Sequence, residues 1–191
     1  MKLAVIIGST RPGRQTPKQA LWVANAANNM EGVSADVIDL KDYNMPFFDE
    51  PASPRYNPNR TISESVKSWL DKIDQYDAYV FATPEYNHSI TGVLKNAMDY
   101  FTTELTRKPS AIVSHGSSGG ARAAMHLREI LGESQSVVIP KAVALSGMST
   151  LIDDAGNLSE EAKANPYGPQ TSLEGMLAEL KWYSDALLAA R

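Results

Sequence analysis

Cysteine is absent from the 191-residue sequence, and histidine is scarce. The lack of cysteine excludes disulfides, thiolate metal sites, iron–sulfur clusters and a cysteine nucleophile. The three histidines, His88, His115 and His126, show no metal-ligand spacing, so we interpret each as a polar surface or loop residue. Any redox chemistry must therefore come from a bound cofactor.

Long apolar runs and an excess of positive charge are also missing. No apolar run approaches the length of a membrane span, and the chain opens on a strand-like segment without a signal-peptide pattern, so we expect a cytoplasmic protein with no membrane span. The formal net charge of −4 argues against a nucleic-acid partner, because such a protein uses a basic face to displace counterions. The length and composition are typical of one globular domain covering residues 1–191.

Five apolar segments alternate with segments of helical periodicity. We expect strands at residues 3–7, 34–40, 78–82, 111–114 and 136–139, with 142–145 as an optional continuation of the last. We expect a first helix whose apolar positions are Ala20, Leu21, Val23, Ala24 and Ala27, and a second near 61–73. A third begins near 93, with Leu94, Ala97, Met98 and Phe101 as its apolar positions, and two more cover 121–131 and 172–189. The alternation predicts an α/β fold: a doubly wound, five-stranded parallel sheet of order 2-1-3-4-5 with helices on both faces.

The loop at residues 8–17 follows the first strand and is rich in groups that bind phosphate. Its hydroxyls and guanidiniums are those of Ser9, Thr10, Thr16, Arg11 and Arg14. A helix N-terminus follows the loop, and it adds backbone N–H groups and a partial positive charge. Because ligands of such sheets bind beyond the carboxyl ends of the strands, where strands 1 and 3 diverge, this loop is well placed to bind a phosphate.

Spacing separates three kinds of phosphate loop. Arg14 and Gln15 stand where a P-loop needs lysine and then serine or threonine. Thr10 occupies the second glycine position of a dinucleotide fingerprint, and we interpret Asp39, after the second strand, as ordinary loop polarity rather than a ribose ligand. A terminal monophosphate fits best, and an ordinary first turn with incidental cations is the alternative.

Two further loops reach the same edge of the predicted sheet. Residues 83–92 are predicted to form a polar turn, in which Pro84 restrains the backbone. Residues 115–120 are rich in glycine, which allows a ligand to approach the backbone closely. A long segment at 41–60 is interrupted by Pro46, Pro51, Pro54 and Pro58 and carries Tyr43, Phe47, Phe48, Arg55 and Tyr56. Its aromatic content favours an ordered binding wall or a subunit contact over a linker.

Three motifs in these loops resemble those of the NADPH-dependent FMN reductase family, whose flavodoxin-like members include quinone, chromate and azo-dye reductases. The motifs are Gly8-Ser9-Thr10-Arg11, then Pro84-Glu85-Tyr86-Asn87 with residues 92–100, and then Gly116 and Gly119-Gly120 with Arg122 and Leu127-Arg128. The resemblance spans residues 3–147, and no matching motif follows Gly147.

The resemblance implies an FMN site and assigns its residues. It places Ser9 and Arg11 on the FMN phosphate, and Gly116 where the flavin ring approaches the fourth loop. We add Thr10 to the phosphate contacts, because its hydroxyl lies between those two residues in the sequence. The family loop continues with serine and then asparagine where this chain has Arg14 and Thr16, and we assign the outer phosphate contacts to Arg14, Gln15 and Thr16. Pro84, Glu85, Tyr86 and Asn87 would edge the isoalloxazine, largely through backbone groups.

The resemblance also implies an activity. Hydride would pass from NADPH or NADH to bound FMN, and two electrons then to a small-molecule acceptor such as a quinone or a flavin. Hydride moves directly between stacked rings, so we expect no catalytic side chain and no metal. The resemblance further implies a homodimer or homotetramer with the flavin near the interface.

Three other functions are weighed against this one. Ser118 lies in a G-x-S-x-G pattern, but a hydrolase of that kind needs an acid and then a histidine downstream, and the last histidine, His126, follows at once on the next helix. A flavodoxin-type electron carrier without nicotinamide activity is the main alternative, and an interaction module without flavin is another. The electron acceptor and the choice between NADPH and NADH stay open.

Overall fold

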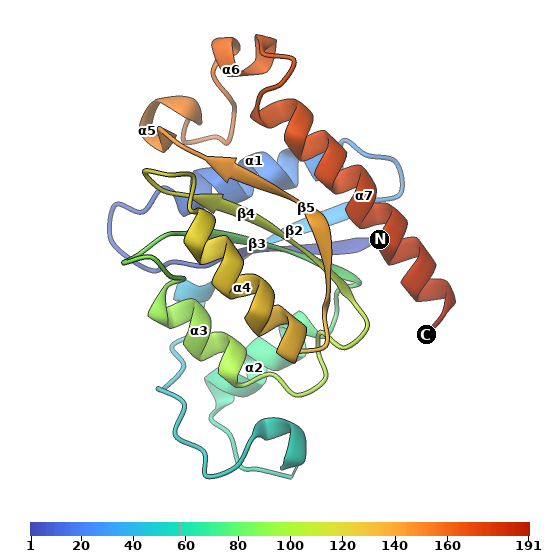
Figure 1. The fold of residues 1–191 in the computed structure, drawn as a ribbon. Coiled ribbons are helices and arrows are strands. Elements are labelled where there is room, and N and C mark those ends of the chain that lie inside the picture. The colour runs from blue at the N-terminus through green and yellow to red at the C-terminus, as the bar shows by residue number, and fades with distance from the viewer. Residues whose placement is uncertain (58) are drawn as a thin grey trace.

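A five-stranded parallel sheet of order β2-β1-β3-β4-β5 forms the centre of the molecule, which confirms the predicted topology. The computed structural model describes residues 1–57 and 59–191, so Pro58 of the proline-bearing segment lies outside the described residues. The strands are β1 (Lys2–Ile7), β2 (Ser34–Asp39), β3 (Ala78–Pro84), β4 (Pro109–His115) and β5 (Val137–Leu145). The loops that follow β1, β3 and β4 leave the sheet at one edge, on the left of Figure 1.

The three central strands are buried along their length. Every residue of β3 and β4 is buried, as are residues 3–7 of β1, which is expected of parallel strands covered on both faces. The register pairs Ile7 with Ala82 and Pro84 with His115, so β3 extends two residues beyond the end of β1. The turn after β3 therefore stands beside the loop after β1.

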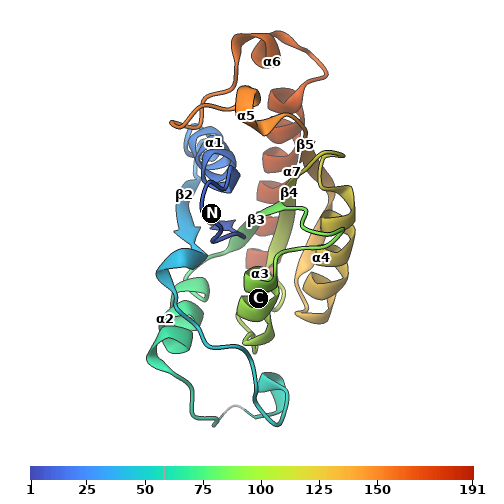
Figure 2. The ribbon, with the colours of Figure 1, turned by 90° about the vertical axis from the view of Figure 1, so that its left-hand side faces the viewer.

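Helices cover both faces of the sheet (Figure 1). One face packs against α1 (Thr16–Asn28) and α7 (Pro169–Ala189), and the other against α2 (Glu64–Ile73), α3 (Gly92–Asp99) and α4 (Ala121–Glu133). Short helices occur at η1 (Leu40–Asp42), η2 (Pro54–Tyr56), α5 (Met148–Leu151) and α6 (Glu160–Ala164). The segment between β2 and α2 extends from one end of the molecule, and α5 and α6 from the other (Figure 2). None of the described helices has the length and apolar character to cross a bilayer.

Details of three elements differ from the sequence prediction. Trp22 is buried on α1, whereas Leu21 is only partly buried, with the backbone at Gly156 packed close to both residues. Phe101 lies beyond the end of α3, yet it is buried and stacks on Trp69. The last strand, β5, runs without a break from Val137 to Leu145 and so includes Pro140. A proline fits there because β5 is an edge strand and its pairing with β4 shifts register between Ser110 and Ile112.

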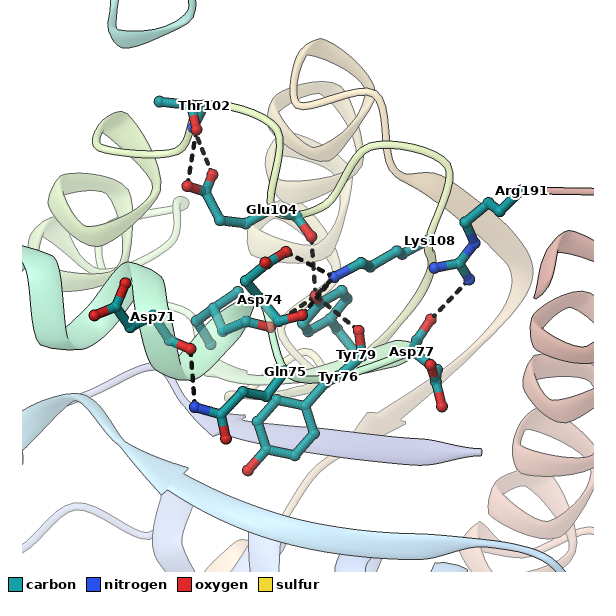
Figure 3. A network of polar contacts seen from close by, with 11 residues as sticks. Asp71, Asp74, Gln75, Tyr76, Asp77, Tyr79, Thr102, Glu104, Lys108 and Arg191 are labelled. Atoms are coloured by element: carbon teal, nitrogen blue, oxygen red, sulfur yellow. Dashed lines mark hydrogen bonds and ion pairs between the residues drawn. The ribbon is translucent and has the colours of Figure 1, made fainter. Parts of the chain in front are cut away.

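Lys108 is buried at the opposite edge of the sheet, where β3 and β4 begin, and forms a network of hydrogen bonds there (Figure 3). The Lys108 ammonium donates to the Asp74 carbonyl oxygen at 2.9 Å, to its carboxylate at 3.2 Å and to the Tyr79 hydroxyl at 3.2 Å. Burial raises the pKa of Tyr79, which keeps the phenol protonated. The network anchors the end of α2 to the sheet, far from the loops that follow the strands.

Candidate functional site

The loop after β1 is held tightly against β3. The Gly8 amide donates to the Ala82 carbonyl oxygen at 2.8 Å, and a Cβ at Gly8 would lie 2.9 Å from that oxygen and from Leu94 Cδ2. The Thr91 hydroxyl donates to the Gly8 carbonyl oxygen at 2.6 Å and accepts from the Leu94 amide at 3.1 Å, so it also caps α3. The start of the loop therefore has a fixed position relative to α3.

Arg14 ties the same loop to the end of β2. Its guanidinium forms a two-point ion pair with Asp39, with Nη1 2.9 Å from Oδ1, and it also donates to the Ser9 carbonyl oxygen. The side chain of Arg14 is only 12% exposed. The structure thus gives Asp39 a defined partner and corrects our interpretation of it as ordinary loop polarity. A phosphate contact from Arg14 stays a prediction.

Arg11 is placed differently from Arg14. It is exposed, and its guanidinium carbon lies 4.9 Å from the centre of the Tyr86 ring. No ion pair holds its guanidinium to a carboxylate of the described residues. Arg11 is therefore the loop cation whose charge is available to an anion.

Buried polar groups near the start of α1 lack partners. The atoms Gln15 Oε1, Thr16 Oγ1 and Gln19 Nε2 are buried and form no hydrogen bond within the described part of the chain. The helix begins at Thr16, and no side chain caps its first N–H groups. The Thr16 hydroxyl and the Gln19 amide nitrogen can donate, whereas the Gln15 oxygen only accepts. Unpaired donors at a helix N-terminus suit an anion.

The turn after β3 is a tight hairpin. Tyr86 and Ser89 exchange backbone hydrogen bonds of 2.9 and 3.1 Å, and Asn87 and His88 between them have φ angles of 49° and 67°. Two positive φ angles characterise a type I′ turn, in which asparagine is favourable. The turn exposes Asn87 and His88 at the edge of the sheet.

Glu85 uses its side chain to cap α4. Its carboxylate accepts from the Arg122 amide at 3.0 Å and pairs with the Arg122 guanidinium at 3.1 Å. Burial alone would raise the pKa of Glu85, but these hydrogen bonds and that of Ala123 lower it overall. The Glu85 amide donates to the His115 carbonyl oxygen at 2.9 Å, which joins this turn to the end of β4. A Cβ at Gly116 would lie 3.3 Å from Glu85 Cβ, so the loop after β4 passes close by.

His115 is buried at the end of β4, contrary to our prediction of a surface or loop residue. His88 and His126 are exposed, but His115 is the last residue of β4 and is buried, with Nδ1 2.8 Å from Gln19 Oε1. Burial, together with the charge of Arg11, lowers the pKa of His115 to about 4, so the ring is neutral at pH 7. The Gln19 side-chain oxygen gives Nδ1 of His115 a hydrogen-bond partner, so the imidazole can be buried at the end of β4. No signal in the sequence links the two residues.

The three loops thus bring an available guanidinium, an uncapped helix N-terminus and a tight turn to one edge of the sheet. The family model of the NADPH-dependent FMN reductases matches residues 1–150. The chain belongs to this family. An NAD(P)H-dependent FMN reductase of Schizosaccharomyces pombe is 35% identical over 145 residues, 76% of this reductase and 72% of that protein. A quinone reductase of Pseudomonas putida is 30% identical over 170 residues, 84% of this reductase and 86% of that protein.

Solved structures show the same fold. The flavoenzyme NAD(P)H:(acceptor) oxidoreductase of Paracoccus denitrificans superposes with a TM-score of 0.74 at 24% identity, covering 97% of each chain. Oxidised flavodoxin 1 of Bacillus cereus superposes with a TM-score of 0.59 at 18% identity over 95% of this chain and 98% of that chain. This reductase is therefore a flavodoxin-like oxidoreductase of a family that uses FMN as its flavin and NAD(P)H as electron donor.

Proposed function

We propose that residues 1–191 form one FMN-binding domain that accepts hydride from NADPH or NADH and passes two electrons to a quinone, a flavin or a similar small acceptor. The observation that carries this proposal is the meeting of the loops after β1, β3 and β4 at one edge, where Arg11 has no carboxylate partner among the described residues. The bound FMN would supply the redox chemistry by taking up a hydride and releasing two electrons. The chain itself has to bind, orient and shield it.

The residues at this edge fit a flavin mononucleotide. The Thr16 hydroxyl, which has no hydrogen-bond partner in the described part of the chain, suits a terminal phosphate. So do the start of α1, whose N-cap residue makes no side-chain cap, and the guanidinium of Arg11. Ser9, Thr10, Arg14 and Gln15 complete the proposed phosphate contacts. Because Arg14 already pairs with Asp39, its part in the proposal is to hold the loop in place, with any phosphate contact secondary.

The turn and the loop after β4 would form the ring side of the site. We propose that Pro84, Glu85, Tyr86 and Asn87 edge the flavin through their backbone groups, since the Glu85 carboxylate is occupied by α4. Gly116 would leave room for the ring.

Exposed aromatic side chains in the segment between β2 and α2 support assembly with further copies of the chain. Phe47 and Tyr56 of this segment are each 84% exposed, so each presents an aromatic surface that a partner subunit could cover. We propose a homodimer or homotetramer, in line with the family resemblance.

The direct test of the proposed ligand is a comparison of flavins. We expect about one FMN per chain, bound more tightly than FAD or riboflavin, because neither of these carries a terminal monophosphate. The measurement is the quenching of flavin fluorescence on titration with apoprotein. Equal affinity for the three flavins would overturn the proposed phosphate site.

A further inference from the structure

The last residues of the edge strand β5 have backbone groups that face away from the sheet. The Leu145 carbonyl oxygen accepts from the Gly116 amide at 3.2 Å, so the backbone groups of Leu145 point towards β4. Successive residues of a strand direct their N–H and C=O groups to opposite sides, so those of Ala142 and Ala144 point outward. No hydrogen bond from the described residues reaches these outward groups.

The preceding part of the same edge is closed to another strand. Pro140 has no N–H group, and its carbonyl oxygen accepts from Arg128 Nη2 at 2.9 Å. Proline and lysine on an edge strand hinder its pairing with a further strand, and Lys141 follows Pro140. Ala142 and Ala144 have small, exposed side chains instead, so their backbone is accessible.

A groove runs along this open part of β5. A cavity of about 380 Å³ has residues 142–146 on one side and the loop before α7, residues 165–169, on the other. It continues into a second cavity of about 410 Å³, beside α5 and α6, through the shared residues Ser146, Leu151, Asn165 and Pro169. Both short helices lie beyond the end of β5 (Figure 1). The lining of the two cavities contains one charged residue, Glu161, which forms no ion pair with the described residues.

The groove has the chemistry to bind an extended polypeptide. Ala142 and Ala144 offer two donors and two acceptors at the spacing of alternate strand residues, a pattern that an added strand satisfies. The exposed carboxylate of Glu161 favours a lysine or arginine in the bound segment.

We propose that β5 binds an extended segment of a partner protein, which carries lysine or arginine and adds a sixth strand to the sheet. The segment pairs with the outward groups of Ala142 and Ala144 and directs its basic side chain to Glu161. It lies next to the loop after β4, because the Gly116 amide is bonded to Leu145.

The probe is a fluorescein-labelled peptide in which valine and threonine alternate between terminal lysines, because these residues favour strands. Fluorescence anisotropy measures its binding to the FMN-loaded protein. We expect a dissociation constant below about 1 mM for the wild type. Ala144→Pro removes one outward N–H group, at a position where an edge strand tolerates proline, and should weaken binding about five- to tenfold.

The matched control is Val37→Pro in β2, the other edge strand. The Ser34 amide donates to the Met1 carbonyl oxygen, so the backbone groups of Val37 also point away from the sheet. This variant should bind the peptide like the wild type, and circular dichroism shows whether both proline variants are folded. A peptide whose alternate amides are N-methylated tests the pairing without any change to the protein, and it should bind at least about fivefold more weakly. Glu161→Gln should also weaken binding and reduce its dependence on salt.

Three results overturn the inference: no binding of the peptide to the wild type at about 1 mM, equal binding by Ala144→Pro, or equal binding of the methylated peptide. Sedimentation velocity tests a different occupant. If Ala144→Pro lowers the mass of the assembly, a second copy of the chain occupies the groove, which also overturns the inference. None of these results bears on FMN binding, so the proposed function is tested separately.

Discussion

Arg11 and Arg14 lie three residues apart in one loop, but they differ in burial and in partners. Arg11 is exposed, and its N–H groups are free to contact a phosphate. Arg11→Ala should weaken FMN binding by about ten- to a hundredfold, because a charge-assisted hydrogen bond contributes about 1.5 to 3 kcal/mol. Riboflavin affinity and the free energy of unfolding of the apoprotein should stay close to wild type. Wild-type FMN affinity in this variant would place the phosphate elsewhere.

Arg14 should show the opposite pattern. Its side chain is 12% exposed and joins Asp39 to the Ser9 carbonyl oxygen. Arg14→Ala should lower the free energy of unfolding by about 1.5 to 3 kcal/mol, since it leaves a half-buried carboxylate without its partner. Urea unfolding measures this, and Asp39→Ala in the same background should add little further loss. A variant of unchanged stability with selectively weakened FMN binding would show that Arg14 contacts the phosphate directly.

His115 should make the stability of the apoprotein depend on pH. The folded state keeps its imidazole neutral down to a pKa of about 4, whereas the unfolded chain takes up a proton near pH 6.5. Stability is therefore full above about pH 6.5 and falls as the pH drops towards 4, by up to about 3 kcal/mol from this residue.

The comparison of two variants isolates the contribution of His115. His115→Asn should flatten the fall in unfolding free energy between pH 6.5 and 4, because an amide does not titrate. His88→Asn is the matched control, since His88 is exposed in a turn whose positive φ angle asparagine accepts. Equal pH dependence in wild type and His115→Asn would contradict the assignment.

At the scale of elements, Thr91 connects α3 to the loop after β1 through one hydroxyl. Thr91→Val removes both the cap of α3 and the hydrogen bond to the Gly8 carbonyl oxygen, and should cost about 1 to 3 kcal/mol in urea unfolding. FMN binding should also weaken, because the loop loses a fixed point. Thr91→Ser keeps the hydroxyl and should restore both properties. Ser63→Ala removes the cap of α2 and a hydrogen bond to the Ser65 hydroxyl but no contact with the loop after β1, so it should reduce stability without affecting FMN.

The elements themselves could be predicted from the sequence, because burial leaves a regular pattern. Apolar runs such as 78–82 show a strand buried on both faces, and the order of the strands follows from the handedness of the crossovers. Short helices were missed: α5 and α6, with 4 and 5 residues, are too short to show a period. The ends of β3 and β4 were set too early, because Pro84 and His115 look like loop residues by composition.

The contacts of the site could not be predicted in the same way. Arg14 with Asp39, Ser9 with Tyr86, and His115 with Gln19 join residues 25, 77 and 96 positions apart. Each residue alone is a common polar residue in a loop or helix, and only the fold brings each pair together. The sequence indicates which loops meet at this edge but not which side chains pair there.

At the scale of the whole molecule, the chain after the family match completes the core. The apolar side of α7, with Leu173, Met176, Leu177 and Leu180, is buried against the same face of the sheet as α1. A β-bridge between Ile152 and Leu158 closes a turn that contains Asp154. Asp154 forms an ion pair with Lys18, which lies just after the loop that follows β1. The segment after residue 150 therefore supports the loop that we propose for the phosphate, although it lacks the family motifs.

The central claim is that this reductase transfers electrons from a nicotinamide to FMN, and an anaerobic experiment tests it most directly. NADPH or NADH, added to the FMN-loaded protein with oxygen and acceptor excluded, should bleach the absorbance of oxidised flavin, and later addition of a quinone should restore it. We propose that donor and acceptor use one open face of the site in turn, and steady-state rates should then give parallel double-reciprocal lines. Flavin that stays oxidised in excess NADPH and NADH, yet is reduced by dithionite, would contradict the account and indicate a flavodoxin-type carrier.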